Sequence, residues 1–192
     1  MTASQGELFA AGSALPNGLV HRPDFITAAE ERELLDGIAT LDLREAAYKE
    51  YTARRRVASF GAGYDFDANE LTPAPLIAPF LLPLRARVAA WVEMDPEAFG
   101  YALVSEYRPN TQLGWHRDVP QFELVAGVSL AGTARMRFRP FPPRRGVPIL
   151  VLDLAPRSAY ILRDEARWGW QHSIAPTPAL RYSITFRTRR AT

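Results

Sequence analysis

Three residues in the second half of the chain could bind one metal ion together. The chain has three histidines, and the triplet His116-Arg117-Asp118 contains one of them. Side chains two residues apart on an extended segment emerge from the same face, so His116 and Asp118 could share an ion. His172 follows further along the chain, in WGWQHSIAP. Two histidines and one carboxylate are the ligand set of a facial non-haem Fe(II) site, which leaves open coordination positions.

A strand predicted near the C-terminus, RYSITFR, carries an arginine at each end. Its alternation places Arg181 and Arg187 on one polar face and apolar residues on the other. A 2-oxo acid can chelate iron through its keto oxygen and C1 carboxylate, and its distal carboxylate then needs a cation. We expect Arg181 to hold that carboxylate and Arg187 to lie nearer the iron and its acidic ligand.

Each feature alone also has a simpler structural explanation. Arg181 and Arg187 could flank a solvent-facing strand, and His172 could satisfy a polar contact between Trp168 and Trp170. An isolated His-x-Asp is a weak indication of metal binding, because it arises often by chance. The combination of this pair, a distant third ligand and a strand with two arginines favours a metal site.

The elements expected to position these residues are helices first and strands after them. Residues 1–23 read as irregular. The run DFITAAEERELLDGIATL predicts an amphipathic helix with Thr27 as N-cap and Glu30 completing a capping box. Residues 42–72 predict short strands or a hairpin, and a second helix should begin near Pro79 or Pro83 and end before Asp95.

From Phe99 onward, six or more short apolar segments separated by glycine and proline turns predict a sandwich or barrel. The expected fold class is therefore mainly β with N-terminal helices (α+β), the helices bracing a jelly-roll-like core. With 192 residues, 47% of them hydrophobic, the chain can bury a core. We expect an irregular segment over residues 1–18 and one domain over 19–192, with a helical and lid part (19–98) and a β core (99–190).

Composition limits the other classes of site. The chain has no cysteine, which excludes disulfides, thiolate catalysis and thiolate-ligated metals. The N-terminal residues lack a basic start followed by an apolar run, and no later segment approaches the ~20 apolar residues of a membrane span. We expect a cytoplasmic protein with no membrane partner, and a monomer.

Positive charge is carried almost entirely by arginine, because Lys49 is the one lysine. Arginine suits planar contact with phosphates and carboxylates. Its clusters could form a nucleic-acid footprint, or they could be a solvated surface in an arginine-biased chain. The clusters are Arg54 to Arg56, then Arg135, Arg137 and Arg139 with Arg144 and Arg145, and finally Arg187, Arg189 and Arg190.

Taken together, these segments resemble the AlkB-type dioxygenases, which depend on Fe(II) and 2-oxoglutarate. The resemblance rests on EYRPNTQLGWHRD, WQHSI and ALRYSITFR, with RRRVASFGAGYDF and the first helix upstream, and spans roughly residues 19–190. It implies a double-stranded β-helix (jelly-roll) fold with Fe(II) as cofactor and 2-oxoglutarate and O2 as co-substrates. The resemblance also implies that His116, Asp118 and His172 bind iron, that Tyr107 and Arg181 contact 2-oxoglutarate, and that Arg187 lies close to the metal ligands.

Three departures from the family pattern bear on the site. Nucleic-acid-repair members usually or often have asparagine where this chain has Ser105 and Ser183. Serine can still form hydrogen bonds, with a shorter reach, so we place both among the 2-oxoglutarate contacts. Repair members also commonly carry acidic residues just after the His-x-Asp, facing the damaged base, where this chain has Val119, Pro120 and Gln121. The last departure concerns base specificity and not the iron chemistry.

The function implied is oxidative demethylation of N-alkylated nucleobases, 1-methyladenine and 3-methylcytosine, in DNA or RNA, as in repair of DNA damage. 2-Oxoglutarate would be converted to succinate and CO2, and the methyl group would leave as formaldehyde. A methylated base must leave its stack to reach a buried centre, and flat side chains usually hold it there. Candidates are Tyr48, Tyr51, Tyr64 and Trp115, although aromatic residues at such positions more often pack in a core or lid.

Two other functions remain open. An oxygenase of the same fold acting on a protein side chain or a small molecule would explain the missing acidic residues after Asp118. A nucleic-acid-binding module with a vestigial iron site is less well supported, because all three candidate ligands and both arginines are present.

Overall fold

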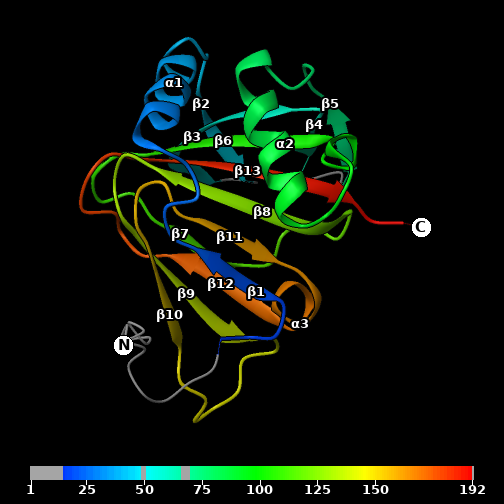
Figure 1. Ribbon diagram of the computed structural model, residues 1–192. Helices are drawn as coiled ribbons and strands as arrows, with labels where there is room; N and C mark the ends of the chain where they lie inside the picture. The colour runs from blue at the N-terminus through cyan, green and yellow to red at the C-terminus, as the bar shows by residue number, and fades with distance from the viewer. Residues whose placement is uncertain (1–14, 49–50, 66–69, 192) are drawn as a thin grey trace, which may run out of the picture.

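The computed structural model of the protein describes residues 15–48, 51–65 and 70–191, and for residues 46–48, 51–54 and 65 it describes the backbone alone. Within this part, strands form two large antiparallel sheets that face each other (Figure 1). The larger sheet has the order β1-β11-β8-β13-β6-β3-β2 and the smaller one β10-β9-β12-β7. The larger sheet comprises β1 (Leu19–Arg22), β11 (Ala159–Leu162), β8 (Phe122–Leu130), β13 (Arg181–Arg189), β6 (Tyr101–Tyr107), β3 (Tyr51–Phe60) and β2 (Arg44–Tyr48).

The smaller sheet packs on the inner face of the larger one. Met136 and Phe138 of the smaller sheet join Val125, Tyr107 and Leu162 of the larger sheet in one buried cluster. This sandwich of antiparallel sheets confirms the predicted jelly-roll core. Its smaller sheet comprises β10 (Leu150–Leu154), β9 (Ala134–Pro140), β12 (Trp170–Ile174) and β7 (Leu113–His116), and a separate hairpin comprises β4 (Ala62–Asp65) and β5 (Glu70–Pro73).

Helices cover the other face of the larger sheet, as the chain order predicts. Helices α1 (Ala28–Ala39) and α2 (Leu82–Trp91) lie against it, at the top of Figure 1. The short elements are α3 (Asp164–Trp168) and the 3-10 turns η1 (Pro79–Leu81) and η2 (Pro96–Ala98).

The first helix begins as its sequence predicts. Thr27 is the N-cap, and its hydroxyl and the Glu30 carboxylate form the reciprocal capping box. Leu34 and Ile38 are buried against the sheet. Gly37 permits the close approach of η1, because a Cβ atom there would lie 2.4 Å from the Phe80 ring.

The alternation in β13 divides it between the two layers. Ile184 and Phe186 are fully buried beneath the helices, whereas Ser183 and Thr185 face the smaller sheet. β13 lies between β6 and β8, with Arg181 opposite Tyr107 and Ser183 opposite Ser105. A central strand thus carries the polar face that the sequence places on it.

Two elements differ from the prediction or were absent from it. Residues 1–23 were expected to be irregular, but β1 pairs antiparallel with β11, with Leu19 opposite Leu162. Four residues are too few to show a period-two pattern, and only pairing with a strand far along the chain makes this segment a strand. Helix α3, which precedes β12, was not predicted either. None of the described helices is both long and apolar enough to cross a membrane.

Candidate active site

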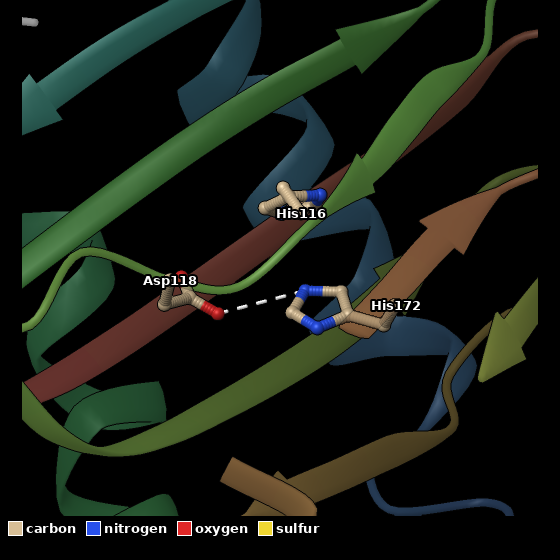
Figure 2. A group of neighbouring side chains, drawn as sticks. All are labelled: His116, Asp118 and His172. Atoms are coloured by element: carbon tan, nitrogen blue, oxygen red, sulfur yellow. Dashed lines mark ion pairs between the residues drawn. The ribbon is translucent and has the colours of Figure 1, made fainter. Parts of the chain in front are cut away.

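The predicted metal ligands come together between the two sheets. His116 ends β7, Asp118 follows in the next loop, and His172 lies on the neighbouring strand β12, directly opposite His116 in the register. One ligand atom from each residue lies within 4.8 Å of the others. Figure 2 shows His172 and Asp118 pointing toward each other, with His172 Nε2 3.5 Å from Asp118 Oδ2. This cluster can hold a metal ion, because each residue offers a donor atom to a common point.

Electrostatics favours an ionised Asp118. Its side chain is 9% exposed and accepts hydrogen bonds at Oδ1 from Nε and an Nη of Arg187, both at 3.2 Å. Burial by itself would raise the pKa of Asp118, but Arg187, followed by the two neighbouring histidines, lowers it well below its ordinary value. With Oδ1 bonded to Arg187, Oδ2 stays available as a metal ligand.

The two histidines are held neutral, as metal ligation requires. Burial, with the neighbouring His116, lowers the pKa of His172 to about 3. Burial also lowers the pKa of His116, outweighing the opposing effect of Asp118. His116 Nδ1 lies 2.9 Å from the Gly114 carbonyl oxygen. Because a carbonyl can only accept, Nδ1 carries the proton and Nε2 keeps its lone pair for a metal.

Arg181 is a buried cation whose charge is only partly satisfied. It is 1% exposed, donates from Nε to Ser129 Oγ at 3.0 Å, and lies with its guanidinium carbon 4.9 Å from the Tyr107 ring centroid. Its Nη1 is buried and has no hydrogen-bond partner among the described residues. Burying a guanidinium with an unsatisfied N–H group lowers the stability of the fold unless an anion occupies the adjacent space. The residues present therefore fit the distal carboxylate of a 2-oxo acid.

A pocket joins Arg181 to the metal cluster. Its empty space is about 440 Å3, counted out to its open mouth. Arg181 and Arg187 of β13 both line it, so the solvent-facing alternative for these two residues is wrong. The predicted contacts Ser105, Tyr107 and Ser183 line it as well, together with the three candidate ligands.

Tyr160 and Arg55, which the sequence analysis did not assign to the site, also line this pocket. Tyr160 of β11 is buried, and burial raises the pKa of its hydroxyl, which therefore stays protonated. Arg55 of β3 donates to the Tyr107 hydroxyl at 3.5 Å, and its Nε is buried without a partner among the described residues. Arg55 was predicted to belong to an arginine cluster at the surface and not to the pocket. Tyr160 is a single tyrosine in an apolar segment, and nothing in the sequence around it indicates a functional role.

Of the aromatic residues proposed to hold a base, the two whose side chains are described, Tyr64 and Trp115, do not line the pocket. The side chains of Tyr48 and Tyr51 lie outside the described residues. Tyr64 is partly buried on β4 and is not among the residues that line the pocket. Trp115 precedes His116 on β7 and, rather than lining the pocket, contacts Arg137 and Arg139.

Comparison with known proteins gives the family of this arrangement. The sequence profile of the 2OG-Fe(II) oxygenase superfamily matches residues 18–187. The chain is similar to "Alkylated DNA repair protein ALKBH8 homolog" of Arabidopsis thaliana, at 28% identity over 180 residues, covering 82% of this chain and 50% of that protein. It is also similar to "DNA oxidative demethylase ALKBH2" of Mus musculus, at 31% identity over 156 residues, covering 72% of this chain and 63% of that protein. The chain thus spans about half to two thirds of these two relatives.

Solved structures with the same fold include OsALKBH1 and a prolyl-4-hydroxylase of Pseudomonas putida. OsALKBH1 has a TM-score of 0.65 at 15% identity, covering 92% of this chain and 100% of the other. The hydroxylase has a TM-score of 0.63 at 15% identity, covering 91% and 94%. At this identity the likeness supports the jelly-roll fold and says nothing of the substrate.

Proposed function

The chain belongs to the 2OG-Fe(II) oxygenase superfamily, and from this premise we propose that it oxidatively demethylates N-alkylated nucleobases such as 1-methyladenine and 3-methylcytosine in DNA or RNA. It is a dioxygenase that uses Fe(II), 2-oxoglutarate and O2, and its similarity is to the AlkB-type members. The observation that carries the proposal is the pocket in which a His-Asp-His cluster and a buried, incompletely paired arginine lie together.

In this proposal, the chain's residues bind and orient the reactants. His116 Nε2, Asp118 Oδ2 and His172 hold Fe(II), and Arg187 keeps the carboxylate ionised and fixed in position. Arg181 binds the distal carboxylate of 2-oxoglutarate beside Tyr107. When bound, these groups supply the oxidation of an N-methyl C–H bond to C–OH by O2, coupled to conversion of 2-oxoglutarate to succinate and CO2. The hydroxymethyl product then releases formaldehyde and the unmodified base.

Support for a nucleic-acid substrate comes from the relatives and from the surface charge. One relative is named as an alkylated DNA repair protein homologue, one as a DNA oxidative demethylase, and a third, from Mus musculus, as a tRNA methyltransferase. The third is 25% identical over 173 residues, and this chain covers 25% of it. Arginines on the outer face of the smaller sheet, among them the partly buried Arg137 and Arg139, give phosphate-binding groups near the site.

A second candidate function follows from the loop after Asp118. Val119, Pro120 and Gln121 offer no carboxylate to a cationic methylated base. The loop therefore also suits an oxygenase acting on a neutral substrate, a protein side chain or a small molecule.

The decisive experiment is mass spectrometry of a single-stranded oligonucleotide that carries both 1-methyladenine and 3-methylcytosine. The purified protein is incubated aerobically with Fe(II), ascorbate and 2-oxoglutarate, beside His116→Ala and beside reactions lacking 2-oxoglutarate. We expect loss of the methyl mass with the wild type alone and only in the complete reaction. Succinate formation without loss of methyl mass would overturn the proposed substrate and favour the second function.

A further inference from the structure

The outer face of the smaller sheet carries arginines that the proposed chemistry does not use. Along β9, Ala134, Met136 and Phe138 are buried between the sheets, so the intervening residues point outward. These are Arg135, Arg137 and Arg139. In Figure 1, β9 lies beside β12 in the layer that faces away from α1 and α2.

Arg137 and Arg139 are held in place by neutral partners. Arg137 Nε donates to Ser173 Oγ at 3.0 Å, and Arg139 Nε donates to Gln171 Oε1 at 2.9 Å. Both guanidinium carbons lie over the Trp115 ring, at 5.2 and 4.5 Å from its centroid. We call Trp115, Arg137 and Arg139 the arginine–tryptophan face.

The charge of this face is left uncompensated within the described part of the chain. No described carboxylate forms an ion pair with Arg137 or Arg139, whereas Arg135, at the far end of the strand, pairs with Asp153 at 3.1 Å. The neutral bonds engage the Nε atoms, and the outer guanidinium nitrogens remain available as donors. Two guanidiniums fixed over one indole, with free outer edges, suit an extended anion that also presents flat groups.

Further cationic residues lie near the C-terminal end of β9, beyond Arg139. Arg117, exposed just after β7, lies with its guanidinium carbon 3.8 Å from the Phe141 ring centroid. Arg144 and Arg145 are exposed in the segment that joins β9 to β10. The ligand is therefore expected to extend beyond a single phosphate.

The face lies close to the pocket because β7 is one of the two edge strands of its sheet. Trp115 and His116 are consecutive on β7, so they project from its opposite faces, one to the outer surface and one into the pocket. A polymer bound on the outer face needs to cross only the edge of one strand to present a residue to the pocket.

We propose that the arginine–tryptophan face binds the backbone of single-stranded nucleic acid next to the nucleotide that enters the pocket. The part of this inference that places a nucleotide in the pocket rests on the proposed function, since only a nucleic-acid substrate would place a nucleotide in the pocket. A single strand fits better than a duplex, because its unpaired bases can stack on the flat groups of this face, the partly exposed Trp115 indole and the guanidiniums beside it.

The test measures binding of a fluorescein-labelled, unmethylated oligothymidylate by fluorescence anisotropy over a series of salt concentrations. Arg137→Gln/Arg139→Gln is compared with Arg32→Gln/Arg44→Gln, which removes the same charge from α1 and β2. We expect the first pair to weaken binding about 10- to 100-fold at low salt. It should also lower the slope of log K against log salt by about 1.4, the value for two single-strand phosphate contacts. The control pair should change binding less than about twofold.

A conservative variant and a duplex separate the remaining outcomes. Arg137→Lys/Arg139→Lys should recover part of the affinity, and thermal unfolding shows whether the glutamine pair is folded. Equal losses with the control pair, an unchanged salt slope, or equal effects on duplex binding would overturn the inference. Binding of an unmethylated strand requires no catalysis, so this result can be read even if the demethylation experiment fails. Demethylation of a long strand with unchanged affinity in the glutamine pair would leave the proposed function standing and remove this inference alone.

Discussion

Individual side chains in the pocket are arranged so that each charge has a defined partner, with two exceptions. Asp118 is paired with Arg187, and burial keeps the adjacent histidines neutral. Arg181 and Arg55 are the exceptions, because Nη1 of Arg181 and Nε of Arg55 are buried without a partner among the described residues. A carboxylate of the co-substrate completes this set of charges in our account.

Replacing Arg181 with methionine should raise the KM for 2-oxoglutarate. Removing one charge-assisted hydrogen-bonding group costs about 1.5–3 kcal/mol, equivalent to about 10- to 100-fold in affinity. Arg189→Met, at the exposed end of the same strand, is the matched control. Succinate formation measured over a range of 2-oxoglutarate concentrations checks the prediction. Equal KM values for the two variants would argue against a carboxylate contact at Arg181.

A second prediction at this scale concerns Gly127 of β8, which packs against Tyr160. A Cβ atom at Gly127 would lie 2.3 Å from Cζ of the Tyr160 ring, whereas one at Gly114 would meet no atom within 4 Å. Gly127→Ala should therefore destabilise the fold by about 1–3 kcal/mol, the usual cost of overpacking. Gly114→Ala should be close to neutral. Chemical denaturation of both variants is the measurement, and similar stabilities would contradict the packing described.

The grouping of the three candidate metal ligands, and the place of Arg181 in the same pocket, were predictable from the sequence. His116, Asp118 and His172 show a spacing that fits a known ligand set, and Arg181 shows a period-two position. Tyr160 and Arg55 could not be assigned to the pocket, because the pairing of β11 with β8 and of β3 with β6 brings them there. Trp115 was one of four candidates for contact with a base, but the side of β7 on which a residue lies depends on the register.

At the level of elements, β13 positions the site because its neighbours fix its register. Arg181 lies opposite Tyr107 on β6, and Ser183 lies between Ser105 on β6 and Ser129 on β8. The alternation of β13 and the helix capping box were readable locally. The pairing of β1 with β11 could not be predicted, because nothing in the sequence of either strand indicates which strand it pairs with.

Strand β3 is tied to β6 by Glu106, which accepts hydrogen bonds from Arg56 at 2.8 and 2.7 Å. Glu106 is 4% exposed, and the hydrogen-bonded Arg56 lowers the pKa of its carboxyl. Glu106→Gln should lower the free energy of unfolding at neutral pH by about 1–3 kcal/mol, because a charged hydrogen-bond acceptor is lost. The exposed partner in Arg85–Glu97 gives the control, Glu97→Gln, which should have little effect.

The pH dependence of this pair has a definite sign. A carboxyl whose pKa is lower in the folded state contributes its stability above the unfolded-state value of about 4.3. That stability is lost as pH falls through the folded-state pKa. The difference in the free energy of unfolding between the wild type and Glu106→Gln should therefore be largest at neutral pH and should decrease below about pH 4. Urea denaturation at several pH values measures it, and a difference that grows on acidification would refute the role of this pair.

In the molecule as a whole, the covering helices, the pocket and the surface arginines lie in different layers. The helices cover one face of the larger sheet, the pocket lies between the sheets, and uncompensated arginines occupy the outer face of the smaller sheet. The jelly-roll class followed from the order of helices and strands. The location of the arginines of β9 on one outer face required the sheet itself.

The central claim is that the His-Asp-His cluster and Arg181 form one Fe(II) and 2-oxoglutarate centre. The most direct test is anaerobic titration of 2-oxoglutarate into the Fe(II)-loaded protein, followed by the visible absorption that appears when a 2-oxo acid chelates Fe(II). The account predicts saturable binding of one equivalent by the wild type, a weakened midpoint in Arg181→Met, and no signal in His116→Ala. An unchanged signal in His116→Ala, or none in a wild type that has taken up Fe(II), would contradict it.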